Sequence, residues 1–233
     1  MTFLELCKRV HLLGRFGEDK PGTAPSTVTA QTGVLAEIVS WVQMAYLDIQ
    51  RQRSRWLFLN KLGTLVMTIG QSGYTPASSG ITDFRELIGS SAESTWPFVG
   101  VYKTTTADET QCHYIPYEQW ILGIYDRGLA SAGNGRPSYF TVKPDNTLAF
   151  YPKPDFAYSV RIPYKRTLHE LVADTDLPII PADYHMLIVW RVISDYYCTT
   201  REAQLLDKKA KEQIRPLWIA LCRDQLPEFT TAS

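Results

Sequence analysis

The sequence lacks the residue patterns that catalytic, metal-binding and membrane proteins need. Its four histidines show no paired metal-ligand spacing, and its four cysteines (Cys7, Cys112, Cys198 and Cys222) form no C-x-x-C pair. We therefore expect reduced thiols, as in a cytosolic protein, and no metal site or cofactor. Apolar runs such as 186–190 are far shorter than the roughly 20 residues of a membrane span. This absence predicts a soluble chain without a membrane partner.

The sequence also has no excess of positive charge and no catalytic motif. Lys plus Arg and Asp plus Glu number 24 each, which argues against a dedicated nucleic-acid or membrane-surface binder. Residues 128–137 (GLASAGNGRP) are rich in glycine but lack the Lys-Ser/Thr pair of a phosphate loop. The pair Asp174 and Asp176 lacks the glycine and the distal glutamate of a calcium loop, which favours a solvated turn. We expect a protein that is not an enzyme.

Two features favour contact with other macromolecules. The sequence has thirteen Tyr and six Trp, and such rings are enriched at interfaces where one edge of the ring stays wet. The stretch 51–56 (RQRSRW) places Arg51, Arg53 and Arg55 beside a tryptophan. One interpretation is an ordinary solvated helix end. The other is non-specific contact with DNA phosphates. Such contact would be transient, because the patch is small and the protein as a whole is neutral.

Both ends of the chain read as helical. Apolar residues recur at helical spacing in four segments: 2–13, 34–53, 181–198 and 206–221. The loop between the first two is rich in Gly, Pro, Ser and Thr. Thr32 is a predicted N-cap, and residues 199–202 fit a capping box. Pro181 suits a first helical turn, whereas Pro216 is expected to kink its helix.

The middle of the chain reads as β-structure. Strands are predicted at 62–70, 97–103 and 112–117, followed by three consecutive antiparallel strands within 139–166, with a turn at 143–146. Short helices are predicted at 81–89 and 117–128. One buried face is expected for the last three strands, made of Phe140, Val142, Leu148, Phe150, Tyr158, Val160 and Ile162.

These patterns predict an α+β fold, a helical bundle built from both chain ends with an inserted antiparallel β domain that is sandwich- or barrel-like. The predicted divisions are a helical domain (1–60 and 177–225), a β-rich insert (61–176) and a C-terminal tail (226–233).

The order of elements resembles the head-to-tail adaptor (connector) proteins of tailed bacteriophages, particularly short-tailed ones. The likeness covers nearly the whole chain. It rests on residues 2–6 (TFLEL), 31–33 (QTG), Trp41, 48–50 (DIQ), 56–58 (WLF), 148–154 (LAFYPKP) and Pro181 with the helix after it.

The resemblance implies a structural protein of the virion neck, assembled in the host cytoplasm. It implies a ring of about twelve copies under the portal protein, a contact with a tail nozzle or tail-tube protein, and non-specific passage of genomic DNA through the ring. On this hypothesis Leu226, Pro227 and Phe229 dock on the portal, and Arg51, Arg53 and Arg55 face the channel or a subunit seam. The alternative is a carbohydrate-binding or tail-fibre-associated β module, which would not need helices at both ends.

Overall fold

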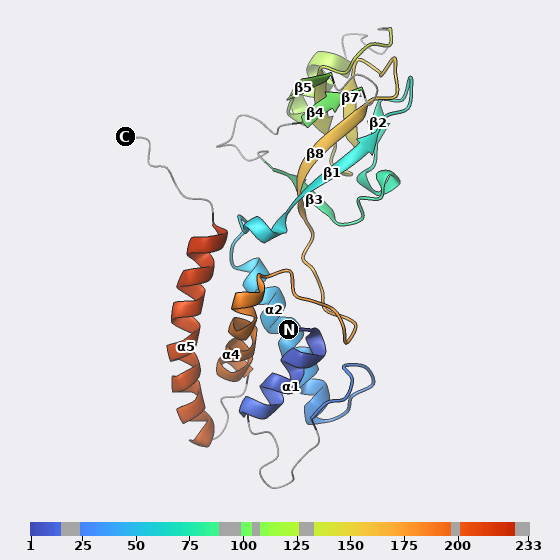
Figure 1. The fold of residues 1–233 in the computed structure, drawn as a ribbon. Coiled ribbons are helices and arrows are strands. Elements are labelled where there is room, and N and C mark those ends of the chain that lie inside the picture. Colours follow the sequence, from blue (N-terminus) through green and yellow to red (C-terminus); the bar gives the residue numbers. More distant parts are fainter. Residues whose placement is uncertain (15–23, 89–98, 104–107, 126–132, 197–200, 227–233) are drawn as a thin grey trace, which may run out of the picture. The chain divides into compact units, whose positions relative to one another are not determined.

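The structure is a computed structural model that describes residues 1–14, 24–88, 99–103, 108–125, 133–196 and 201–226 (Figure 1). The chain divides into two compact units, one of Met1–Leu59 with Leu168–Ser233 and one of Asn60–Thr167. The predicted α+β class is confirmed. Residues 168–176, which the sequence pattern assigned to the insert, group with the first unit.

The first unit contains the four predicted helices, and all four are confirmed: α1 (Phe3–Gly14), α2 (Val34–Arg51), α4 (His185–Tyr196) and α5 (Arg201–Gln225). Two short 3-10 turns, η1 (Leu57–Leu59) and η5 (Ala182–Tyr184), precede strand β1 and helix α4. All four helices contribute to one apolar core, and α5 runs alongside α4 in Figure 1. Trp41, Trp190 and Trp218 lie in or against this core.

Three details of the helices bear on the sequence-based expectations. The N-cap of α2 is Gly33 rather than Thr32, and Gly33 adopts a φ of 58°, which a residue without Cβ reaches at little cost. α5 runs without a break from Arg201 to Gln225 with Pro216 inside it, and the kink expected at Pro216 stays a prediction. Two residues of the proposed capping box, Thr199 and Thr200, lie outside the described residues.

The second unit is built on a sheet of eight strands within the described residues: β1 (Asn60–Val66), β2 (Gly73–Tyr74), β3 (Phe84–Leu87), β4 (Val99–Tyr102), β5 (Glu109–Tyr114), β6 (Tyr139–Val142), β7 (Leu148–Tyr151) and β8 (Ser159–Arg166). The strand order is β1-β8-β4-β5-β6-β7-β2, and β3 also pairs with β8. Every pair is antiparallel except β5 with β6, which is parallel. A 3-10 turn, η2 (Pro76–Ser79), follows β2, and α3 (Tyr117–Trp120) with the π-helical turn η3 (Ile121–Tyr125) confirms the short helix predicted there.

The predicted hairpin between β6 and β7 is confirmed. Asn146 adopts a φ of 62° in its turn, and the Lys143 N–H donates to the Thr147 carbonyl at 2.9 Å. The predicted third strand does not continue this hairpin: β8 pairs instead with β1, β3 and β4. The free edge of β7 is taken by β2, and the connection to β8 carries Pro152 and Pro154, which have no amide hydrogen for a ladder.

The prediction of a helix at 81–89 is wrong, because residues 84–87 form β3. Phe84 and Leu87 are three apart, as on a helix, yet both pack on the core of the second unit. A register shift between Phe84 and Glu86 adds one residue to the strand, which returns Leu87 to the side of Phe84. The β-bulge therefore gave two residues on one side of a strand a spacing of three, which is also typical of a helix. The shared buried face of β6, β7 and β8 is confirmed, with Val142 partly buried.

Candidate functional site

The three arginines of the sequence analysis lie at the end of α2 and on the turn that leads from it to η1. Arg51, Arg53 and Arg55 are all exposed. Arg51 Nη1 lies 3.4 Å from the carboxylate of Asp48. Arg53 donates a hydrogen bond to Cys222 of α5, which opposes the larger effect of burial that raises the pKa of this thiol. The turn therefore presents guanidinium groups to solvent while one of them holds the end of α5.

A fourth arginine from α4 extends this surface. Arg191 donates from Nη2 to the side-chain oxygen of Gln52 at 3.0 Å, and its guanidinium lies over the ring of Trp218 at 5.6 Å. Its Nη1 is 3.4 Å from Asp195. Sequence reasoning missed Arg191, although it is the only charged residue between His185 and Asp195 in an otherwise apolar helix. We name Arg51, Arg53, Arg55 and Arg191 the basic surface.

Trp56 supports the basic surface from below. Its side chain is fully buried, and its Nε1–H donates to the carbonyl of Ile49 at 3.0 Å. Its ring stacks on Phe58 and meets Trp218 edge-on, with ring centroids 5.3 and 5.5 Å away. The turn that carries the arginines is thus anchored by a buried aromatic cluster. Exposed arginines on such an anchored turn suit contact with a polyanion or with an acidic protein surface.

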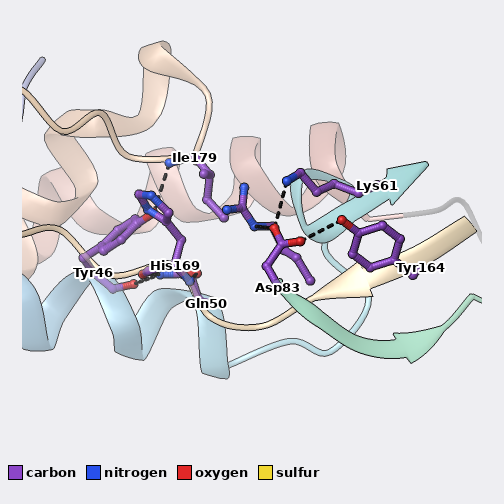
Figure 2. Close-up of polar contacts among 8 residues, drawn as sticks. Tyr46, Gln50, Lys61, Asp83, Tyr164, His169 and Ile179 are labelled. Atoms are coloured by element: carbon purple, nitrogen blue, oxygen red, sulfur yellow. Dashed lines mark hydrogen bonds and ion pairs between the residues drawn. The ribbon is translucent and has the colours of Figure 1, made fainter. Parts of the chain in front are cut away.

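Polar side chains of α2 hold the segment that follows the β insert. Figure 2 shows Tyr46 and Gln50 meeting His169 and Ile179. Gln50 and His169 exchange two hydrogen bonds of 2.9 Å between the Gln50 amide group and the His169 backbone. The Tyr46 hydroxyl accepts the Ile179 N–H at 3.0 Å and lies 2.9 Å from His169 Nδ1. One turn earlier, Gln43 donates to the Leu171 carbonyl at 2.8 Å.

This arrangement is a clamp, which we define as Gln43, Tyr46 and Gln50. The three residues share one face of α2, because they are three and four positions apart. Two of them are buried in the core face, where an unpaired amide would be costly. A polar residue recurring at helical spacing within an apolar stripe was the sequence signal for the clamp, and the sequence analysis did not use it.

The turn with Asp174 and Asp176 is structural, as the sequence analysis favoured. The Asp176 carboxylate accepts the N–H groups of Val172 and Ala173, both at 2.7 Å, and these bonds lower its pKa. The Asp174 carboxylate accepts the Val28 N–H at 2.6 Å. The backbone carbonyls of both aspartates accept N–H groups from the first turn of α1. Both carboxylates serve the backbone.

In the second unit, the carboxylate of Asp83 contacts three polar side chains near the two ends of the insert. Lys61 Nζ lies 2.8 Å from its carboxylate, and the Tyr164 hydroxyl donates to it at 2.7 Å (Figure 2). Arg166 Nε is 3.2 Å from the same carboxylate. Burial acts to raise the pKa of Asp83, but Lys61, Tyr164 and Arg166 outweigh it and the pKa is lowered. Burial, followed by the hydrogen bond to Asp83 and the charge of that carboxylate, raises the pKa of Tyr164 to about 12, although the charge of Arg166 acts to lower it.

The C-terminal candidates are only partly described. Leu226 is partly buried against the core of the first unit, and its N–H donates to the Cys222 carbonyl at 3.0 Å. Pro227 and Phe229 lie outside the described residues. Across the described ranges, no three His, Cys, Asp or Glu side chains are grouped as a metal ion would require. No helix there is long and apolar enough to cross a bilayer.

The described residues thus form an α+β protein with one exposed basic surface and one internal polar clamp. The family model of the SU10 adaptor protein matches residues 1–224. The chain belongs to this family of phage head–tail adaptors. The resemblance inferred from the sequence is confirmed. No individual curated protein matches the chain.

Proposed function

We propose that this protein is a structural component of the virion neck, without a catalytic step, that joins the portal protein to the tail. On this proposal about twelve copies form a ring in the host cytoplasm, and genomic DNA passes through its channel. Helices from both chain ends form one ring-forming bundle, and the inserted sheet meets tail proteins. The membership of residues 1–224 in a phage adaptor family carries this proposal. Two further facts support it: α1, α2, α4 and α5 share one core, and the insert begins and ends on paired strands.

A mass measurement tests the assembly. The purified protein is mixed with purified portal protein of the same phage, and the complex is weighed by native mass spectrometry and imaged by electron microscopy. A ring of about twelve chains on the portal is expected. A trimer that does not bind the portal would favour the tail-fibre alternative. A monomer that does not bind the portal at any concentration tested would contradict the adaptor role.

The basic surface is proposed to face the DNA channel or a subunit seam. This assignment is motivated by three exposed arginines beside the buried Trp56 and by the DNA that would pass through the proposed channel. Replacing Arg51, Arg53 and Arg55 by Gln should change genome retention or release more than ring assembly. The matched control replaces the exposed Lys208, Lys209 and Lys211 of α5 by Gln, which removes the same charge elsewhere. Equal effects of the two triple variants would leave the arginines as an ordinary solvated helix end.

The segment 226–233 is proposed to dock on the portal through Leu226, Pro227 and Phe229. The resemblance motivates this assignment. The alternative is that the segment folds back on its own subunit, and Leu226, which follows α5, is partly buried against the core of the first unit. Removal of the residues after Gln225 should leave a folded protein that no longer joins portal-containing capsids. Phe229→Ala should weaken portal binding, while Thr230→Ala serves as its neighbour control. Unchanged portal affinity of the truncated protein would refute the docking.

A further inference from the structure

Strand β1 forms one edge of the sheet, and its outer side has no partner among the described residues. β1 pairs with β8 along all seven of its residues on one side. No other backbone hydrogen bond involves Asn60–Val66 in the described part of the chain. Natural sheets usually protect such an edge by a short strand, a proline, a bulge or a charge. The opposite edge is short, since β2 is only Gly73–Tyr74.

The direction of each backbone group on β1 follows from its neighbour Met67. The Met67 N–H donates to the Tyr158 carbonyl at 2.7 Å, so residue 67 points its backbone groups at the chain that contains β8. Backbone groups alternate along a strand, so Leu65, Gly63 and Lys61 also point at β8. The N–H and C=O groups of Leu62, Thr64 and Val66 therefore point to the open edge.

The side chains of the same three residues are exposed. Leu62 is 68% exposed and Val66 is 63% exposed, and Thr64 between them is exposed too. On the other face, Leu65 is buried, and Ile81 lies so close to Gly63 that a Cβ there would meet it at 2.5 Å. The charge of Lys61 is held by Asp83. We name Leu62, Thr64 and Val66 the open edge. It offers backbone pairing and apolar side chains without a free charge.

We propose that the open edge of β1 receives an extended, uncharged segment of a tail protein, which adds a strand to the sheet beside Leu62, Thr64 and Val66. Only an extended backbone satisfies the alternating N–H and C=O groups of the edge. Apolar residues at alternate positions of that segment pack beside Leu62 and Val66. The partner assignment rests on the proposed adaptor ring.

A second copy of this chain fits the open edge less well. Pairing of β1 with β1 is two-fold symmetric, whereas neighbours in a cyclic ring meet through two different surfaces. Pairing of β1 with the other edge of the sheet would engage only the two residues of β2. Since neither of these two self-pairings fits, we assign the seven-residue edge to a different protein.

The test uses Thr64→Pro in the full-length protein. Proline at this position removes only an amide that points to the open edge, so the pairing of β1 with β8 is kept. Thr64→Ser keeps the amide and is the matched control. Each variant, assembled on the portal, is titrated with the purified nozzle or tail-tube protein of the same phage. We expect Thr64→Pro to weaken tail binding by about tenfold or more and Thr64→Ser to leave it unchanged.

A second variant and a second measurement keep the test decisive. Leu62→Lys with Val66→Lys should also weaken tail binding, and circular dichroism confirms that each variant is folded. In the free protein, the amides of Leu62, Thr64 and Val66 should exchange with deuterium fast, and the tail protein should protect them. Unchanged tail binding by folded Thr64→Pro overturns the proposal. If the wild type forms dimers that Thr64→Pro abolishes while tail binding is unchanged, the open edge serves self-association. That result also overturns the proposal. Absence of portal-bound rings in the wild type would instead contradict the adaptor function.

Discussion

Replacement of Trp56 by alanine should destabilise the first unit more than any exposed substitution beside it. Trp56 is fully buried, and truncation of a buried tryptophan costs about 3–5 kcal/mol. The ring also contacts Phe58 and Trp218, and aromatic pairs contribute about 0.5–1.5 kcal/mol beyond their buried area. At about 2–8 °C per kcal/mol, the melting temperature should fall by at least about 6 °C.

A second substitution separates the hydrogen bond of Trp56 from its packing. Ile49 is one of the last residues of α2, whose carbonyls lack partners within the helix, and the indole N–H supplies one. Trp56→Phe keeps most of the apolar ring but leaves this carbonyl unpaired, at a cost of about 1–3 kcal/mol. The loss should therefore be smaller than for Trp56→Ala.

Thermal unfolding followed by circular dichroism at 222 nm checks both variants. Leu57→Ala is the control, because Leu57 is the adjacent residue and 44% exposed, and its change should stay within about 1 kcal/mol. If Trp56→Ala melts with the wild type, or if Leu57→Ala loses as much, then Trp56 does not anchor the turn between α2 and β1.

Three further predictions follow from the described contacts. Replacement of residues 60–167 by a short Gly/Ser linker should leave a folded helical protein, because Asn60 and Lys165 are paired and the ends of the insert are close; loss of the helical circular dichroism signal would contradict this. The pKa of Asp83 is lowered in the folded protein, so its ionised form stabilises the fold above the ordinary pKa of 3.8, and this stabilisation is lost as the pH falls through the lower folded value. The difference in melting temperature between wild type and Asp83→Asn should therefore be largest at neutral pH and shrink below pH 3.8. A difference that does not depend on pH would refute this prediction. Burial raises the pKa of Cys7 and Cys112 to about 12, so peptide mapping after alkylation of the native protein at pH 8 should find both unmodified and Cys222 more reactive.

The helical part of the fold was predictable because its signal is local. Apolar residues such as Phe3, Leu6 and Val10 are spaced three and four apart, and this spacing alone defines the buried stripe of α1. The hairpin of β6 and β7 was predictable for the same reason, since Asn146 and its neighbours determine the turn within a few residues.

The partners of β8 were not predictable from local patterns. Its neighbours are β1, about 100 residues earlier, and β3 and β4, which come from separate parts of the insert. Alternation identified Val160 and Ile162 as buried, but alternation is the same whichever strand lies alongside. At β3, the bulge near Arg85 gave a strand the spacing of a helix. Long-range pairing and bulges leave no unique trace in a single sequence.

The candidate site shows the same division. The exposed arginines were visible as a cluster in the sequence, but Arg191 joins them only through folding, since its contact with Gln52 spans 139 positions. The clamp of Gln43, Tyr46 and Gln50 likewise holds residues more than 100 positions away. Such contacts require the return of the chain after the insert, which no local pattern describes.

The anchor at Trp56 and the open edge of β1 are linked by the covalent chain. Only three residues separate Trp56 from Asn60, and Leu59 at the end of η1 is itself buried in the core of the first unit. Any tension that a bound tail segment applies along β1 therefore reaches a fully buried tryptophan within four residues. Helix α2 follows directly, because the Trp56 indole N–H bonds to its last turn. On the proposed function, a tail segment that pulls on the open edge would thus act on the packing of the helical core, and the same connection would transmit the load to the proposed ring.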